Sequence, residues 1–393
     1  MRRSYKFRMR PTSRQHVALA ACLDAHRELY NAALQERRDA WRHSRTRIRY
    51  GDQSAQLTEI RSMRPDVAAW SFSSQQATLR RLTKAFDGFF RRVTVGATPG
   101  YPRFKGKNRF DSVEWPKDGD GARWHPESSR VYLLGVGQVK VTAHRQVKGR
   151  VKTIQIRREG KRWYVILSCD EVPANPLPGT GTQIGVDVGI ASFATTSGGA
   201  HVHNPRWART AATELGAAQR RLATKKRGSN NRRRARDTLA ARHRKIANQR
   251  RDFHHKTARR LVTDYDMVVV EDLNIRNMLR RAKPVPDPDH PGQYLANGAA
   301  RKSGLNRSIS DAAWGQFVSI LRAKAEDAGR VMIEVDPRHT SDRCERCGYA
   351  AKENRVAQAL FRCGSCGLEA DADEHAARNI LRAGLARHAA AAA

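Results

Sequence analysis

The chain has 393 residues, of which 74 are Lys or Arg and 38 are Asp or Glu, so its formal charge at neutral pH is +36. This length leaves room for two or three domains, and the charge excludes an ordinary soluble domain with a small net charge. Such a chain repels itself unless it meets a polyanion. Because the basic residues run from Arg2 to Arg387, we expect a nucleic acid to contact most of the protein.

Cysteine usage and hydropathy indicate a reducing compartment. Four of the six cysteines fall in a metal-binding pattern, which leaves Cys22 and Cys169 as small core residues. The basic N-terminus is not followed by an apolar signal segment, and no run approaches the ~18 apolar residues of a membrane helix. We therefore expect a cytoplasmic protein with no membrane partner.

The chain begins with an expected strand and a long helix. Residues 1–10 alternate basic side chains with larger apolar ones before Pro11, which favours an edge strand. Thr12 or Ser13 can cap a helix that continues to about Trp41.

Further helices are expected near residues 54–63 and from about Ser73. The apolar faces of the first and third helices are assigned to the core, namely Val17, Ala20, Leu23, Tyr30, Ala33, Leu34, Leu79, Leu82, Phe86, Phe89, Phe90 and Val93. The opposite face of the third helix is basic and can line a nucleic-acid groove.

A loop at residues 100–110 mixes cations with aromatic rings. Arg103, Lys105 and Lys107 can contact phosphates, while Tyr101 and Phe104 pack or stack on bases. The alternating segments that follow predict a small antiparallel barrel or sheet with strands at 112–115, 130–134, 137–141, 153–157 and 163–169. Proline and glycine at residues 173–181 then indicate a linker.

The second half opens with an apolar strand that contains one carboxylate, Asp187, and two further strands follow. Residues 206–262 read as a pair of long basic helices. The cations at their bend are expected to bind phosphate, and they are Lys225, Lys226, Arg227, Arg232, Arg233 and Arg234.

A second apolar strand ends in Glu271. Residues 276–307 are expected to be a mobile basic loop, long enough to suggest a function. A helix is predicted to start at Ser308 or Ser310, followed by a strand at 331–335 and, from Asp373, by the last helix.

A four-cysteine motif dominates the C-terminal quarter. Cys344 and Cys347 are followed after fifteen residues by Cys363 and Cys366. This spacing is a strong zinc signal, because two Cys-x-x-Cys-Gly turns present four thiolates to one tetrahedral ion. Two disulfides or a redox site are the alternatives, but neither explains two turns of the same design. A site with four Cys ligands is closed, so its role is structural.

The order of the predicted elements is that of an RNase H-like core. Three strands precede a helix, a strand, a helix, a strand and a final helix. In such a core an Asp, Glu, Asp set meets on one edge, which here is Asp187, Glu271 and Asp373. Hard oxygen ligands of this kind hold Mg²⁺, and a metal pair ~3.5 to 4 Å apart can activate water and stabilise the leaving oxygen of a phosphodiester.

With these motifs the sequence resembles the TnpB proteins of bacterial insertion sequences, which are guide-RNA-directed nucleases related to the type V CRISPR effectors. The resemblance spans nearly the whole chain. The matching segments are 185–189, 270–273, 340–348 and 371–380, with a weaker match at 102–105.

The resemblance implies a multidomain fold of the α+β and α/β classes. Its expected parts are a β-barrel wedge domain at 1–10 and 100–178, an inserted helical recognition lobe at 11–99, an RNase H-like (RuvC) nuclease domain at 179–335 and 373–393 with a basic helical insertion at 206–262, and a zinc ribbon at 336–372.

The resemblance also implies the roles of the site residues. Asp187, Glu271 and Asp373 would be the catalytic Mg²⁺ ligands, and the four cysteines would hold a structural Zn²⁺. Asp373 is preferred to Asp371 because it takes the position of the family's last acid. The family usually has Asn where His375 stands, so an imperfect hydrogen bond and lowered activity are expected there.

The implied function is that of an RNA-guided DNA endonuclease of a transposable element in the bacterial cytoplasm. Its partners would be a guide RNA from the element, the target double-stranded DNA and its displaced strand. The alternatives are a guide-independent structure-specific nuclease or resolvase, and a nucleic-acid-binding regulator without cleavage. The large N-terminal half argues against the first, and three acids that repel one another without a cation argue against the second.

Overall fold

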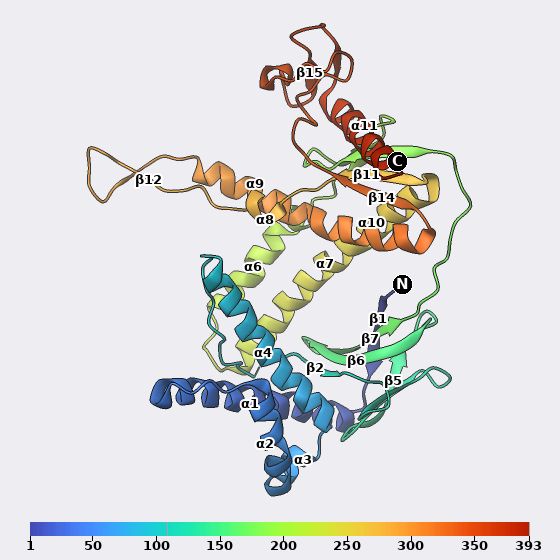
Figure 1. Cartoon of the computed structure of the whole chain (residues 1–393). Helices are drawn as coiled ribbons and strands as arrows, with labels where there is room; N and C mark the ends of the chain where they lie inside the picture. Colours follow the sequence, from blue (N-terminus) through green and yellow to red (C-terminus); the bar gives the residue numbers. More distant parts are fainter. Residues whose placement is uncertain (108, 393) are drawn as a thin grey trace. The chain divides into compact units, whose positions relative to one another are not determined.

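The computed structural model describes residues 1–107 and 109–392, and the chain separates into two compact units, Met1–Pro173 and Ala174–Ala393 (Figure 1). Part of the predicted linker is packed against the second unit rather than free. The N–H of Asn175 donates to the carbonyl of Asp327, and the N–H of Leu177 donates to the carbonyl of Ala328.

The first unit contains a curled, seven-stranded antiparallel sheet (Figure 1). Its strands are β1 (Arg3–Arg10), β2 (Ser112–Trp115), β3 (Ala122–His125), β4 (Arg130–Leu133), β5 (Gly137–Thr142), β6 (Arg150–Glu159) and β7 (Arg162–Asp170). Their order across the sheet is β2-β6-β7-β1-β5-β4-β3. The five strands predicted between residues 112 and 169 are confirmed, whereas β3 was not predicted.

The prediction that residues 1–10 form an edge strand is wrong. β1 lies inside the sheet, paired with β5 on one side and with β7 on the other. Tyr5, Phe7 and Met9 are buried, and the residues between them are less so. The edge interpretation relied on Pro11, but this proline follows the strand and removes no N–H from its hydrogen-bond ladder.

The helices of the first unit are α1 (Ser13–Ser44), α2 (Tyr50–Met63), α3 (Pro65–Ala68) and α4 (Phe72–Thr94). Helices α1 and α4 start where the sequence predicts, whereas α2 starts four residues before the predicted range of 54–63 and α3 was not predicted. Thr12 caps α1 in a capping box with Gln15, and Ser71 caps α4.

The apolar faces of these helices are only partly core. Leu79 and Leu82 of α4 are buried, but Phe90 is 48% exposed, Val93 is 50% exposed, and Val17 of α1 is 70% exposed. The buried residues of α4 all lie in its first half. Helical periodicity identifies a face correctly but does not show how far the packing partner extends along it.

The second unit contains a five-stranded mixed sheet. Its strands are β8 (Gln183–Asp187), β9 (Ser192–Thr196), β10 (His201–His203), β11 (Met267–Glu271) and β14 (Val331–Val335). Their order is β10-β9-β8-β11-β14, in which β8, β11 and β14 are parallel and the β9 and β10 pairings are antiparallel. This agrees with the element order that the sequence predicts.

Helices and small hairpins complete the second unit. The helices are α5 (Trp207–Thr210), α6 (Ala212–Ala223), α7 (Asn230–Asp264), α8 (Ile275–Met278), α9 (Ala299–Ala312), α10 (Trp314–Ala328) and α11 (Ala372–Ala392). The short strands are β12 (Val285–Pro286), β13 (Tyr294–Leu295), β15 (Leu360–Arg362) and β16 (Glu369–Asp371), with a 3₁₀ turn at Lys352–Asn354. The basic pair predicted at 206–262 is seen as α6 and α7, which pack side by side (Figure 1).

The interpretation of residues 276–307 as an irregular loop is wrong. This segment contains the β12–β13 hairpin and most of α9, so Ser308 and Ser310 lie inside a helix rather than at its start. The sequence contains no signal for this helix start, because the residue before α9 is Gly298, which has no side chain that could cap the helix.

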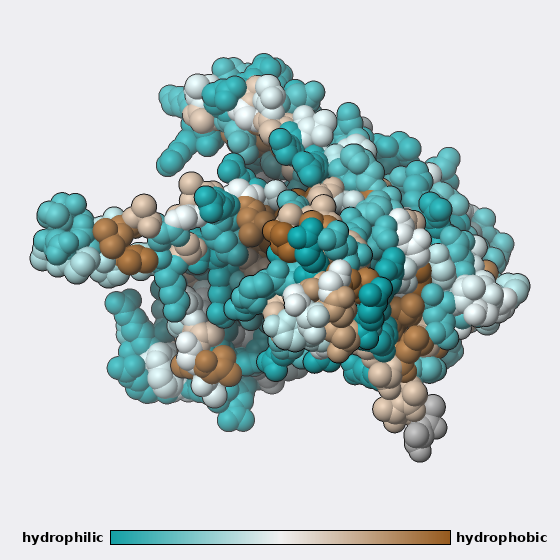
Figure 2. Space-filling view, turned by 90° about the horizontal axis from the view of Figure 1, so that it is seen from above, coloured by the Kyte–Doolittle hydropathy of each residue, from teal (hydrophilic) through white to brown (hydrophobic). Residues whose placement is uncertain are grey.

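The surface reflects the composition. Figure 2 shows mainly hydrophilic residues on the visible face, with hydrophobic residues in small groups. Among the described residues, no helix is both long enough and apolar enough to cross a membrane.

Candidate metal centres

Two of the three predicted acids lie at one edge of the mixed sheet. β8 and β11 are parallel neighbours in which Val186 pairs with Val270, so the next residues, Asp187 and Glu271, leave the sheet at the same end. The strands are buried up to these residues, and each acid is the first partly exposed position after an apolar run. The sheet therefore brings together two carboxylates that are 84 residues apart in the chain.

Helix α11 carries the third acid and packs directly on these strands. A Cβ on Gly185 would lie 2.1 Å from the carbonyl oxygen of Ala377, so only glycine permits the contact. Gly384 serves the same purpose against Val269 of β11, where a Cβ would lie 2.4 Å from a methyl carbon. Asp373 lies one helical turn before Ala377, so this packing places it near the carboxyl end of β8.

The electrostatics of Asp187 indicate that the three acids interact. Burial, followed by the charges of Glu271 and Asp373, raises the pKa of Asp187 to about 7, while the guanidinium of Arg355 opposes the shift. Burial also raises the pKa of Glu271, against the effect of the Thr340 hydroxyl, which donates to Oε1 of Glu271 at 2.6 Å. Carboxyls that resist ionisation in this way favour a bound cation.

The acids form a looser group than a closed metal site. Nη2 of Arg355 lies 3.0 Å from Oδ1 of Asp373 and forms an ion pair with it. Among the described residues, two groups of three or more His, Cys, Asp or Glu side chains have ligand atoms within 4.8 Å of one another. The three acids belong to neither group. The structure thus brings these carboxylates to one edge without closing them around a single point.

The four cysteines are one of the two close groups. Sγ of Cys344 lies 3.6 Å from Sγ of Cys366, and Sγ of Cys347 lies 3.5 Å from Sγ of Cys363. A disulfide requires about 2.05 Å, whereas thiolates at the corners of a tetrahedron with Zn–S of about 2.3 Å are about 3.8 Å apart. The cluster therefore fits a tetrahedral metal and excludes the disulfide alternative for this conformation.

The backbone of the two turns is the same. The N–H of Gly348 donates to the carbonyl of Cys344, and the N–H of Gly367 donates to the carbonyl of Cys363, each at 3.0 Å. Sγ of Cys363 accepts the backbone N–H groups of Cys366 and Ser365. These hydrogen bonds, of which the one from Cys366 has the larger effect, lower the pKa of the Cys363 thiol to about 6. A thiol that ionises so readily is a good metal ligand.

His375 joins the ribbon to α11. Its ring is fully buried and stacks on Phe361, with centroids 3.7 Å apart. Its Nε2 accepts the N–H of Glu345, which lies inside the first cysteine turn, at 3.2 Å. One turn later, Nδ2 of Asn379 donates to the carbonyls of Thr340 and Arg343.

The second close group consists of His201, Asp371 and Glu374, and each of these side chains already has a partner in the protein. Oδ1 of Asp371 accepts the N–H groups of Asp373 and Glu374 and so caps α11. Nε2 of His201 lies 3.6 Å from Oε1 of Glu374, whose other oxygen pairs with Arg378. Asp371 thus acts as the cap of the helix that carries Asp373.

The three cations of the first unit that were predicted to contact phosphates differ in how many contacts they make with the rest of the protein. Arg103 is exposed. The Lys105 backbone is bonded twice to the amide of Asn31, and its ammonium lies over the ring of Tyr30. Lys107 lies 3.3 Å from a carboxylate oxygen of Asp24.

The cations at the bend between α6 and α7 also differ in exposure and in their contacts. Lys226, Arg227, Arg233 and Arg234 are exposed, and Lys225 is half-buried. Arg232 donates instead to the carbonyls of Leu222 and Lys225, at 2.9 and 2.8 Å. It closes the end of α6, so its role at the bend is at least partly structural.

Sequence reasoning missed two residues of the acid group. Arg355 gave no local signal, since it is a single arginine in an irregular part of the ribbon. Thr340 opens the matching segment 340–348, but its hydrogen bond to Glu271 joins residues 69 positions apart and depends on the tertiary fold.

Three family models match the chain. Residues 166–282 match the OrfB_IS605 model, described as "Probable transposase", residues 314–380 match the "Cas12f1-like, TNB domain" and residues 1–46 match a "Helix-turn-helix domain". Over residues 1–46 the structure has one strand and one long helix, so this last match is not accompanied by a helix-turn-helix.

Relatives extend the similarity over the whole chain. The chain is 32% identical to the "Putative RNA-guided DNA endonuclease InsQ" of Escherichia coli (strain K12), over 98% of this chain and 92% of that protein. It is 32% identical to a "Putative RNA-guided DNA endonuclease" of Streptomyces pristinaespiralis, over 99% and 91%. It is 27% identical to the "CRISPR-associated endodeoxyribonuclease Cas12f1" of Sulfoacidibacillus thermotolerans, over 64% and 58%.

The chain therefore belongs to the OrfB_IS605 transposase family. Its relatives include proteins named RNA-guided DNA endonucleases and TnpB-like proteins, and it is related to Cas12f. This confirms the family that the sequence motifs indicate.

Proposed function

We propose that this chain is an RNA-guided DNA endonuclease of a transposable element. The observation that carries this proposal is its similarity, over nearly its full length, to two proteins named as such endonucleases. Both units are included in that similarity, so the proposal concerns the whole chain. Base pairing between the guide RNA and the target strand would select the target sequence, and the protein would hold the nucleic acids through its basic surface.

The second unit is proposed to be the RNase H-like (RuvC) nuclease domain, with the zinc ribbon at 336–372. Its strand order, with three parallel strands and an antiparallel hairpin, supports this assignment. The strands of the first unit are proposed to form the wedge domain at 1–10 and 100–178, into which residues 11–99 are inserted as a helical recognition lobe. The helices α1 to α4 lie between β1 and β2 in the chain, which supports this division.

Asp187, Glu271 and Asp373 are proposed to hold catalytic Mg²⁺. Their carboxylate oxygens are hard ligands of the kind this ion prefers. When bound, the metal supplies an activated water and charge stabilisation at the phosphodiester. The protein contributes the placement of the acids, because the β8–β11 pairing fixes two of them and α11 brings the third. Thr340 orients Glu271 through its hydroxyl.

The four cysteines are proposed to hold a structural Zn²⁺. Their spacing of 3.5 to 3.6 Å fits that ion. The ribbon also carries Thr340 and Arg355, which contact Glu271 and Asp373. Zinc would therefore support the nuclease site indirectly, by ordering the segment that holds its acids.

The partners are proposed to be a guide RNA, double-stranded target DNA and its displaced strand. The exposed cations support contacts with phosphates, and they include Arg103, Lys226, Arg227, Arg233 and Arg234.

Two measurements test the proposal. Asp187→Ala should abolish Mg²⁺-dependent cleavage of a target that matches the guide, while the amount of RNA that copurifies stays the same. Undiminished cutting by this variant would remove the acids from the mechanism. Sequencing of the copurified RNA should reveal one enriched species, and a random RNA population would instead favour a guide-independent nuclease.

A further inference from the structure

The second close group, formed by His201, Asp371 and Glu374, has the donor atoms of a transition-metal site. It combines one imidazole with two carboxylates, which are ligands that Zn²⁺ accepts together. The ligand atoms lie within 4.8 Å of one another, close enough for small side-chain rotations to bring them onto one ion. The Mg²⁺ and Zn²⁺ sites proposed above use none of these side chains.

Three separate segments bring this group together. His201 is the first residue of β10, the edge strand of the mixed sheet. Asp371 ends β16, and Glu374 lies in the first turn of α11. The turn between β9 and β10 packs against this helix, since a Cβ on Gly199 would lie 3.2 Å from Oε1 of Glu374. The group therefore joins the edge of the sheet to the start of the helix that carries Asp373.

The imidazole of His201 is oriented for metal binding. Its Nδ1 lies 3.2 Å from Oγ1 of Thr195 and 3.3 Å from Oγ of Ser192, within hydrogen-bond distance of both hydroxyls. With the proton on Nδ1, the ring donates to these oxygens and keeps a lone pair on Nε2. Metal-bound histidines are held in the same way, with one nitrogen on the ion and the N–H of the other on a hydrogen-bond acceptor.

The contact between His201 and Glu374 has the length expected of two ligands on one ion. Nε2 of His201 lies 3.6 Å from Oε1 of Glu374, which is longer than the ~2.7–3.2 Å of an N–H···O hydrogen bond. Two ligands of a tetrahedral Zn²⁺, each about 2.0–2.2 Å from the ion, are about 3.3–3.6 Å apart. A lone pair on Nε2 and a carboxylate oxygen repel each other unless a cation lies between them.

Both carboxylates keep one oxygen for a metal. Oδ1 of Asp371 caps α11 by accepting two N–H groups, and no group in the described part of the chain donates to Oδ2. Oε2 of Glu374 pairs with Arg378 at 3.2 Å, while Oε1 faces His201. Arg378 also pairs with Glu345 at 3.0 Å, so its charge is divided between two carboxylates. The helix cap and the ion pair thus hold the two carboxylates in place and leave one oxygen of each available.

We propose that His201, Asp371 and Glu374 bind a Zn²⁺ ion, with water completing its coordination. Zn²⁺ suits this mixture of nitrogen and oxygen ligands better than Mg²⁺, which prefers oxygen ligands alone. The ion would pin β10 to the first turn of α11, next to Asp373. Its binding does not depend on the endonuclease function proposed above, so the two can fail separately.

The test counts zinc ions bound to variants of the full chain. His201→Gln removes the imidazole, and Glu374→Gln removes one carboxylate but keeps an oxygen for Arg378. His203→Gln is the matched control, because His203 lies on the same strand, is also exposed and is not in the group. Every protein, including the parent, carries Asp187→Ala to weaken metal binding at the nuclease acids. Equilibrium dialysis over a range of free Zn²⁺ concentrations, followed by elemental analysis, gives the bound zinc.

The parent and His203→Gln should bind one zinc ion beyond the ion held by the cysteines, with the same affinity. His201→Gln and Glu374→Gln should bind it at least about tenfold more weakly, since loss even of a residue that orients a metal ligand costs about 10–100-fold. When free Zn²⁺ is about tenfold above the Kd of the parent, hydrogen exchange in the first turn of α11 should slow by about tenfold. This protection should be absent in His201→Gln.

Three results would overturn the proposal. If His201→Gln keeps the additional zinc ion at parental affinity, the imidazole is not a ligand. If the parent binds no zinc beyond the ion at the cysteines, the group is only an ion pair between a protonated His201 and Glu374. If His203→Gln loses zinc as His201→Gln does, surface histidines bind the ion without a defined site. Cleavage is absent from all these measurements, so their outcome leaves the endonuclease function untouched.

Discussion

The four-cysteine cluster and the three carboxylates of the second unit are built in opposite ways. The cysteines come from two turns of one short ribbon, and their sulfur atoms converge within 4.8 Å. The acids come from two strands and a helix, and Asp373 pairs with Arg355 instead of closing on the others. The difference shows that a site formed by local backbone turns can be compact, whereas a site formed by distant elements depends on whatever holds those elements.

The ribbon is part of what holds the acids. Thr340 lies just before the first cysteine turn and donates to Glu271, and Arg355 lies between the two turns and pairs with Asp373. His375 and Asn379 of α11 bond to the same ribbon. The ribbon that carries the cysteines is thus bonded to two of the acids and to α11, so we expect the compact centre to stabilise the open one.

The largest effect is expected from loss of the cysteine cluster. Cys363→Ser should remove zinc and disorder the ribbon, because structural zinc sites contribute about 10–16 kcal/mol to folding. Cleavage should be lost completely, since Thr340 and Arg355 would no longer contact the acids. Metal analysis, hydrogen exchange over residues 340–372 and a cleavage assay measure this. Cys169→Ala, in the other unit, is the control and should keep its zinc.

If a zinc-free protein retained an ordered ribbon and full cleavage, the dependence of the acids on the cluster would be refuted.

Two aspartates of the second unit, Asp187 and Asp311, should respond oppositely to replacement by asparagine. The pKa of Asp187 is raised from 3.8 to about 7, so its ionised form weakens folding progressively as the pH rises from about 4 to 7. Asp187→Asn should therefore stabilise the second unit by about 1–3 kcal/mol at pH 8 without added Mg²⁺, while cleavage is lost. Asp311 is satisfied by Arg250 and two N–H groups, so Asp311→Asn should destabilise by about 3 kcal/mol.

Hydrogen exchange of the backbone amides of β8 and α9 measures the stability change in each variant. This measurement does not require two-state unfolding of the whole chain. Destabilisation by both substitutions would mean that Asp187, like Asp311, is a structural acid.

A smaller effect is expected at the link between the two centres. Thr340→Val removes the hydroxyl that donates to Glu271 at 2.6 Å but keeps the side-chain shape. Cleavage should fall by about 10–100-fold, as for other residues that orient metal ligands, while the zinc content stays at the parental value. Thr340→Ser keeps the hydroxyl and should recover most of the activity. A Thr340→Val protein with parental rates would show that the two centres are independent.

The smallest effect concerns pH. Because the pKa of Asp187 is about 7, its ionised fraction falls up to tenfold for each pH unit below that value. The Mg²⁺ concentration for half-maximal cleavage should therefore drop by up to tenfold from pH 6 to pH 7 and level off above pH 8. Titration of Mg²⁺ at each pH measures this, with guide binding as the control. An identical Mg²⁺ requirement at pH 6 and pH 8 would contradict the raised pKa.

The N-terminal half shows where sequence patterns reach their limit. Alternation located the strands from 112 to 169, and capping residues located the start of α1, because both depend on neighbours along the chain. The position of β1 inside its sheet and the exposure of Phe90 depend on which elements pack against them, which no local pattern records. The start of α9 was missed because it lacks a capping side chain.

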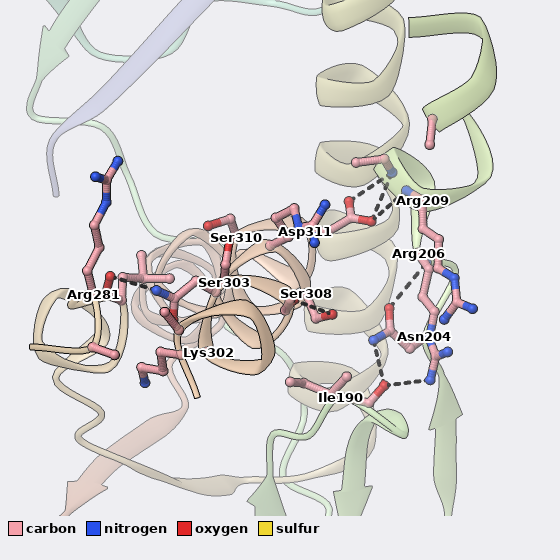
Figure 3. A pocket seen from close by; sticks show the side chains of 18 of the residues that line it. Ile190, Asn204, Arg206, Arg209, Arg281, Lys302, Ser303, Ser308, Ser310 and Asp311 are labelled. Atoms are coloured by element: carbon pink, nitrogen blue, oxygen red, sulfur yellow. Dashed lines mark hydrogen bonds between the residues drawn. The ribbon is translucent and has the colours of Figure 1, made fainter. Parts of the chain in front are cut away.

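By itself, the sequence determined the cysteine turns and the family, and it predicted three acids as metal ligands, because each of these features is marked by a short local motif. Only the tertiary structure decided how the acids are held. The approach of α11 to Gly185, the hydrogen bond from Thr340 and the ion pair of Arg355 join residues far apart in the chain. Likewise, Arg206, Arg281 and Lys302 come from separate segments of the chain. They line one cavity only in the folded second unit (Figure 3).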